Sequence, residues 1–128
     1  MKTILVDAIN ALVLEDGSIL EPMYQLLESY SNNKIVLTGA NDEQFKKFKL
    51  NQVPYEVFTL KHNPEKTDPE YFKILLEKYR LRIDDVIYFE HNEEVFRTAL
   101  SLGIASYFYD HTKEDMDGLK KFLDENLR

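Results

Sequence analysis

The sequence predicts an α/β fold: one domain with a five-stranded, mostly parallel sheet and helices on both faces. Five short β-rich runs alternate with segments whose apolar residues recur at helical spacing, which is the pattern of successive strand–helix units. Some of these runs are apolar throughout, as expected for strands buried on both faces. A chain of 128 residues has the usual size of one domain, so we expect residues 1–128 to form a single unit.

The amino-terminal part supplies two strands and two helices. Residues 3–6 are an apolar run that predicts the first strand, and an Asp-Gly pair within residues 11–20 predicts a small β-hairpin after it. Pro22 occupies the favoured first position of a helix. Residues 35–38 form the second strand, and Asn41 is placed to cap a short helix.

The same alternation continues to the carboxyl terminus. Residues 55–59 form the third strand, and Thr67 or Asp68 caps a helix that begins at Pro69. The elements after it are a strand at 86–89, a helix over 93–102, a strand at 105–109 and a last helix capped by Thr112. Each expected strand is separated from the next by a helix, which is the connection that parallel strands require.

The composition excludes several classes of function. Lys and Arg number 16 against 23 Asp and Glu, a net charge of −7, so nucleic acids and anionic membrane surfaces would be repelled. The chain has no Cys, which excludes disulfides, thiolate metal sites and a cysteine nucleophile. The amino terminus carries too few apolar residues for a signal peptide, and we expect a cytoplasmic protein.

Polar side chains follow the expected strands, at the sheet edge where α/β proteins bind ligands. Asp7 can serve as a carboxylate nucleophile, and Thr38 and Lys66 can hold a phosphate through a hydroxyl and an ammonium group. Glu90 and His91 can hold a metal ion or a water molecule. Each residue alone is common in turns, caps or solvated loops, but their order along the chain makes the set a candidate site.

From Thr3 to about Tyr109 the chain resembles the haloacid dehalogenase (HAD) superfamily of phosphohydrolases. Residues 4–12 stand where that family has an apolar strand followed by Asp-x-Asp-Gly-Thr-Leu. Residues 36–39 resemble its second motif, a strand that ends in Thr or Ser. Residues 66–72 resemble its third motif, commonly Lys-Pro-Asp-Pro-x-x-Phe, and residues 86–92 resemble its fourth.

This resemblance implies a Rossmann-like domain whose sheet has the strand order 3-2-1-4-5. It implies that Asp7 is the nucleophile, that Thr38 and Lys66 bind phosphate, and that Asp7, Glu90 and His91 stand at metal-binding positions. We also expect no cap domain. The stretches after the first and second strands are filled by the hairpin and by elements of the core itself.

Departures from the family pattern indicate impaired catalysis. The aspartate that serves as general acid and base in the phosphatases is replaced by Ile9, which cannot transfer a proton. Asn10 and Ala11 replace the usual Gly-Thr. His91 stands where a second metal-binding aspartate is usual, and its imidazole weakens a Mg²⁺ site because Mg²⁺ prefers oxygen ligands.

An altered metal site is the alternative to impairment. Together with Asp7, the imidazole of His91 can favour Mn²⁺ or Zn²⁺ over Mg²⁺. Glu93, Glu94 or Asp110 could then complete the ligand set. The metal-free dehalogenase branch of the family is disfavoured, because a site without a cap would leave a halide pocket open to water.

Three functions stay open from the sequence. The first is an impaired member that keeps an anion pocket at Asp7, Thr38 and Lys66 for a small phosphorylated ligand or a protein partner. The second is an active metal-dependent phosphomonoesterase. The third is a phosphoacceptor switch or a protein-interaction module. His62 and His111 are expected in loops and receive no role.

Overall fold

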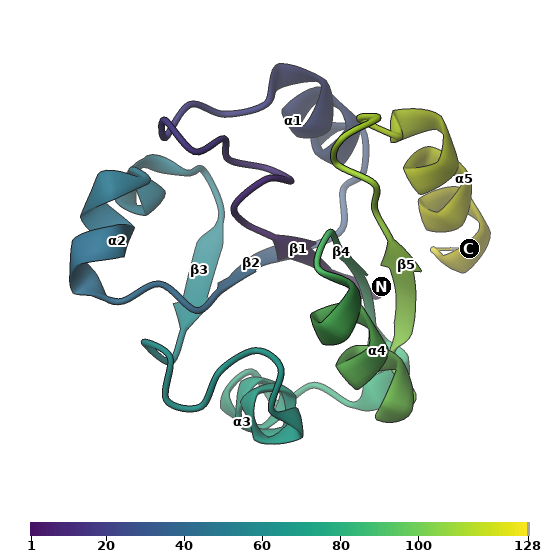
Figure 1. The fold of residues 1–128 in the computed structure, drawn as a ribbon. Helices are drawn as coiled ribbons and strands as arrows, with labels where there is room; N and C mark the ends of the chain where they lie inside the picture. Colours follow the sequence, from purple (N-terminus) through teal and green to yellow (C-terminus); the bar gives the residue numbers. More distant parts are fainter. Residues whose placement is uncertain (128) are drawn as a thin grey trace.

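Five parallel strands form the middle layer of the molecule in the computed structural model, which describes residues 1–127 (Figure 1). The strands are β1 (Thr3–Asp7), β2 (Lys34–Thr38), β3 (Glu56–Thr59), β4 (Val86–Glu90) and β5 (Ala105–Phe108). The sheet order is β3-β2-β1-β4-β5, and every pairing within it is parallel. The strand order and the fold class expected from the sequence are therefore confirmed.

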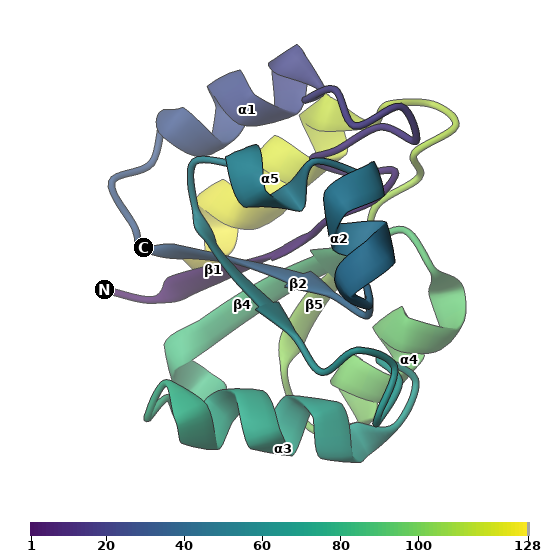
Figure 2. The ribbon, with the colours of Figure 1, turned by 90° about the vertical axis from the view of Figure 1, so that its left-hand side faces the viewer.

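Helices cover both faces of this sheet. They are α1 (Glu21–Glu28), α2 (Asp42–Lys47), α3 (Pro69–Lys78), α4 (Glu93–Ser101) and α5 (Met116–Asn126). Two 3₁₀ turns, Leu50–Gln52 and Ile83–Asp85, lie in the connections. Figure 2 shows α1, α2 and α5 on one side of the sheet and α3 and α4 on the other. Among residues 1–127, no helix combines the length and the apolar character needed to cross a bilayer.

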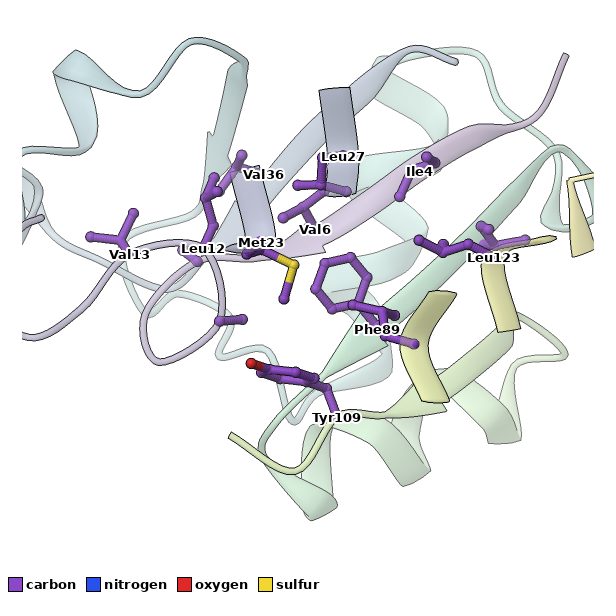
Figure 3. Close-up of a cluster of buried hydrophobic side chains, with 14 of the residues drawn as sticks. Ile4, Val6, Leu12, Val13, Met23, Leu27, Val36, Phe89, Tyr109 and Leu123 are labelled. Atoms are coloured by element: carbon purple, nitrogen blue, oxygen red, sulfur yellow. The ribbon is translucent and has the colours of Figure 1, made fainter. Parts of the chain in front are cut away.

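The central strand β1 is buried on both faces, which explains its unbroken apolar run. Ile4 and Val6 face the layer of α1 and α5, where they pack in one cluster with Met23 and Leu123 (Figure 3). Leu5, between them in sequence, belongs to the opposite cluster, formed with side chains of α3 and α4. The alternation fixes β1 rigidly between two cores, so the residue at its carboxyl end has a defined position.

The connections that follow β1 and β2 are short core segments. The predicted hairpin over residues 11–20 is reduced to isolated bridges: Val13 pairs antiparallel with Ile19, and Leu14 N–H donates to Ser18 at 2.8 Å. After β2 come α2 and the first 3₁₀ turn. The described residues include no further domain inserted at either place.

One predicted cap is wrong. The last helix begins at Met116 and is capped by Asp115, whose side chain accepts from Gly118 N–H at 3.1 Å. Thr112 instead uses its backbone and hydroxyl to donate to Asp110, at 3.0 Å and 2.6 Å. Thr112 therefore stabilises a turn before the helix, and the helix starts later than the sequence suggested.

Candidate functional site

The carboxyl ends of the central strands open into a cavity of about 280 Å³. Because β1, β2 and β4 are adjacent and parallel, their last residues meet at one edge of the sheet. The candidate residues of the four motifs line this cavity, namely Asp7, Ile9, Thr38, Lys66, Glu90 and His91. Asp110, Glu93 and Glu94 do not line it, and the metal-ligand group found in the described chain does not include them.

Asp7 is buried at the floor of the site, with only 2% of its surface exposed, and both of its oxygens are bonded. Its Oδ1 accepts from the ammonium of Lys66 at 3.0 Å. Its Oδ2 accepts from the backbone N–H of His91 at 3.0 Å and is also bonded to Nδ1 of the same residue. The carboxylate is thus held on one side by a lysine and on the other by the backbone N–H and the ring Nδ1 of one histidine.

Lys66 bridges the two buried carboxylates of the site. Its Nζ lies 3.0 Å from Asp7 and 2.7 Å from Oε1 of Glu90, and it donates to the Leu37 carbonyl at 3.3 Å. Glu90 is 1% exposed and is also bonded to the hydroxyl of Tyr88. Lys66 is therefore the counter-ion of Asp7, and the same ammonium also contacts Glu90.

The electrostatics of the site are balanced by its own side chains. Burial opposes ionisation of Asp7, but the charge of Lys66 and the bond from His91 hold its pKa below the ordinary value. Burial likewise disfavours the charged form of Lys66, yet Asp7 and Glu90 raise its pKa above the ordinary value. Burial also lowers the pKa of His91, but its bonds to Asp7 and Glu90 prevail and raise it to about 10. At neutral pH the Asp7 carboxylate therefore faces an ammonium and an imidazolium.

A metal ion could be held by Asp7, Glu90 and His91, whose ligand atoms all lie within 4.8 Å of one another. The donor chemistry fits Mg²⁺ poorly. One donor is an imidazole nitrogen that already bonds Asp7, and the Lys66 ammonium contacts both carboxylates. Mn²⁺ and Zn²⁺ accept imidazole more readily, so they suit this ligand set better.

Thr38 and Ile9 complete the inner wall. Thr38 is held in place because its Oγ1 accepts from Ala40 N–H at 3.1 Å and its carbonyl accepts from the Tyr71 hydroxyl at 2.8 Å. Because the Thr38 hydroxyl oxygen accepts from Ala40, the proton of the same hydroxyl is available to a ligand. Ile9 lines the same cavity with a side chain that has no proton to give.

Two histidines that received no role from the sequence lie at the site. His62 lines the cavity, with Nδ1 3.1 Å from Oε2 of Glu65 and Nε2 2.6 Å from Oε1 of Gln44. The His111 ring packs edge to face on His91, at 4.9 Å between centroids. Gln44 belongs to α2, and His111 follows β5, so both contacts arise from the topology and carry no local signal in the sequence.

Comparison with known proteins supports the fold assignment. No protein-family model matches the chain, and no curated protein matches its sequence. A solved HAD family enzyme from Bacteroides thetaiotaomicron, an aspartate-to-alanine mutant in complex with magnesium and inorganic phosphate, superimposes with a TM-score of 0.70. The match has 16% identity and covers 93% of this chain and 98% of that one.

Two further structures are similar. An uncharacterized protein from Corynebacterium glutamicum gives a TM-score of 0.65 at 14% identity, covering 97% of this chain and 96% of that one. The core domain of a proposed phosphoglycolate phosphatase from Streptococcus pneumoniae gives 0.57 at 21% identity, covering 83% and 78%. With its five parallel strands in the order 3-2-1-4-5, the chain has a HAD-like fold.

Proposed function

We propose that the cavity binds a phosphate-type anion and that its phosphatase chemistry is impaired. The observation that supports this most strongly is the bonding of Asp7, because Lys66 and His91 engage both of its oxygens. A carboxylate nucleophile must direct a lone pair at phosphorus, and each hydrogen bond to it lowers its nucleophilicity. Asp7 is therefore better placed to hold the two cations than to attack.

The same residues offer donors to an anion. The Thr38 hydroxyl proton is free for a ligand, and Lys66 supplies positive charge at the floor of the cavity. The second ring nitrogen of His91, Nε2, has no partner among residues 1–127 and carries a proton when the ring is charged. Charge-assisted hydrogen bonds of this kind are the usual way in which proteins hold phosphate oxygens.

Ile9 is a second reason to expect impaired catalysis, because it cannot protonate the leaving group. In the HAD phosphatases the corresponding aspartate protonates the leaving group. A proton donor at this point contributes roughly 10²–10⁴-fold to rate. His62 does not replace it, because both of its ring nitrogens are bonded to protein acceptors.

An active metal-dependent phosphomonoesterase is the second candidate. It is favoured by the clustering of the Asp7, Glu90 and His91 ligand atoms, and by the fold neighbour that holds magnesium and phosphate. The imidazole makes Mn²⁺ or Zn²⁺ a better choice than Mg²⁺ for this chain. In this case Asp7 would be the nucleophile and turnover would require the ion.

The test combines binding with turnover. Inorganic phosphate is titrated into the protein and followed by NMR, with Lys66→Met and Thr38→Val as variants and Ser18→Ala, outside the cavity, as control. Hydrolysis of an aryl phosphate is measured with Mg²⁺, Mn²⁺ or Zn²⁺. We expect phosphate binding that both cavity variants weaken, and no turnover above that of Asp7→Asn. Metal-dependent turnover that Asp7→Asn abolishes would establish the second candidate instead.

We also propose the class of ligand and the cellular location. Residues 1–127 insert no cap domain over the cavity, so the ligand can be a small phosphorylated molecule or a phosphorylated side chain of a protein partner. We place the protein in the cytoplasm, where such ligands are abundant.

A further inference from the structure

A second polar cluster lies at the wall of the same cavity, away from Asp7. We call it the His62 clamp and define it as His62 with Gln44 and Glu65. Oε1 of Gln44 accepts the Asn41 backbone N–H at 3.0 Å, which identifies the atom facing His62 as an oxygen. Glu65 offers a carboxylate oxygen to the other ring nitrogen. Both neighbours are acceptors, so only a doubly protonated ring can donate to each of them.

The clamp joins two segments that are distant in sequence. Gln44 lies on α2, whereas His62 and Glu65 lie in the connection between β3 and α3, residues 60–68, which also contains Lys66. Next to it, the ammonium of Lys61 pairs with Asp42 of α2 at 3.0 Å, so the two segments are tied twice. Lys66 therefore belongs to a connection whose position depends on the His62–Gln44 and Lys61–Asp42 contacts with α2.

The backbone around His62 is adapted to this contact. Lys61 and His62 both have left-handed conformations, with φ of 54° and 65°, which non-glycine residues adopt infrequently. The ring packs so closely on Gly39 that a Cβ there would lie 3.2 Å from Nδ1. The connection therefore gives up favourable backbone geometry to place the ring over the loop that follows Thr38.

We propose that His62 is a positioning residue whose protonation latches this connection against α2 and so sets the position of Lys66. When the ring is neutral, one of its nitrogens becomes an acceptor that faces an acceptor oxygen, and one side of the latch is lost. Glu65 is the charged group in contact with the ring, and the neighbouring Lys61 pairs with Asp42 of α2. The consequence for anion binding rests on the proposed function, whereas the latch itself does not.

The latch is tested by amide hydrogen exchange over residues 60–66 between about pH 5.5 and pH 8, the range in which histidines change charge. After correction for intrinsic exchange, we expect opening to increase with pH by up to about fivefold, because the pairs involved are exposed. In His62→Asn the pH dependence should disappear, and asparagine tolerates the left-handed backbone. Lys61→Met, the matched control, should loosen the connection but keep the pH dependence.

Glu65→Gln provides the rescue. Its amide can donate to a neutral ring, so the connection should stay protected at high pH without the wild-type pH dependence. A purely structural role for Glu65 would give loosening at every pH. A wild-type pH profile in His62→Asn, or uniform loosening in Glu65→Gln, overturns the proposal.

The link to the cavity is measured with sulfate, which stays a dianion over this pH range. Sulfate affinity should fall by up to about fivefold as pH rises in the wild type and should be flat in His62→Asn. If sulfate binds with the same pH profile in both proteins, His62 does not position Lys66. If sulfate does not bind at any pH, the proposed function fails, while the exchange data still decide on the latch.

Discussion

Asp7 is a carboxylate that the protein stabilises unusually well without any ligand. It is buried, yet a lysine contacts one of its oxygens and a histidine contacts the other. A buried charge is tolerated when partners of opposite charge and hydrogen bonds replace water. Asp7, Lys66, Glu90 and His91 therefore form one network of side-chain contacts, in which removing any member leaves its partners without a contact.

Lys66→Met tests this balance directly. It leaves Asp7 and Glu90 buried with His91 as their remaining cation, so we expect a loss of about 3–5 kcal/mol in the free energy of unfolding. The pKa of Asp7 should rise, as NMR titration would show. The control is Lys120→Met, which breaks an exposed pair and should change stability by less than about 1 kcal/mol. Equal effects of the two variants in urea unfolding would contradict the network.

Tyr109 is the opposite case, a buried polar atom that lacks a partner. Its ring lies in the core cluster of Figure 3 with no exposed surface, and its hydroxyl has no hydrogen-bond partner among residues 1–127. Tyr109→Phe should therefore leave stability unchanged or raise it by up to about 1 kcal/mol.

The matched control is Tyr71→Phe. Tyr71 is equally buried, but its hydroxyl donates to Thr38 at 2.8 Å and lies 3.3 Å from the Phe58 carbonyl. Its removal should lower stability by about 1–2 kcal/mol in urea unfolding. A destabilised Tyr109→Phe would show that its hydroxyl is satisfied after all, for instance by a buried water.

At the scale of elements, two neighbouring polar residues, Thr112 and Asp115, compete as the cap of α5. Asp115 caps this helix and Thr112 does not, so Asp115→Ala should cost about 0.5–2 kcal/mol and Thr112→Ala less. Asp115 also accepts a hydrogen bond from the Tyr107 hydroxyl, and Tyr107→Phe measures separately how much this bond contributes to stability. Equal losses from Asp115→Ala and Thr112→Ala in thermal unfolding would contradict the assignment of the cap.

The elements show how far the sequence determines this fold. The strands and most helix starts follow from local patterns: the apolar run of β1 and the Asn41 cap of α2 are confirmed, and Pro22 lies in the first turn of α1, one residue after the helix begins. The predicted cap at Thr112 failed because Thr, Asp and Ser residues stabilise turns as readily as helix ends, and the choice depends on tertiary contacts.

The site was predictable where the strands themselves deliver the residues. Asp7, Thr38 and Glu90 end neighbouring strands, so topology alone brings them together. The role of His62 was missed, because its partner Gln44 lies on a helix whose position follows from packing. Nor could the sequence show that His91 bonds Asp7 through both its backbone and its ring.

At the scale of the whole molecule, the network makes stability depend on pH. The pKa of Asp7 is below its ordinary value of 3.8, so its stabilisation is complete above that pH and is lost on acidification. The pKa of His91 is raised from 6.5 to about 10, so its stabilisation is complete below pH 6.5 and is lost as pH rises toward 10. Stability should therefore decline on both sides of the weakly acidic range.

His91→Gln isolates the alkaline side. The variant should be less stable than the wild type in weak acid, and the difference should shrink steadily as pH rises to about 9. Urea midpoints of both proteins across this range provide the measurement. Because every other titrating group is common to both, a difference that stays constant with pH would show that His91 is not held in its charged form.

Impaired catalysis in a site that keeps its charge balance is the central claim, and one rate measurement tests it most directly. Aryl-phosphate hydrolysis with Mg²⁺ is compared between the wild type and Ile9→Asp/His91→Asp, with Asp7→Asn added to that background as control. The double change restores a proton donor and an oxygen ligand, so Mg²⁺-dependent turnover should appear and should vanish with Asp7→Asn. Comparable Asp7-dependent turnover in the wild type, or a folded double variant with none, would contradict the claim.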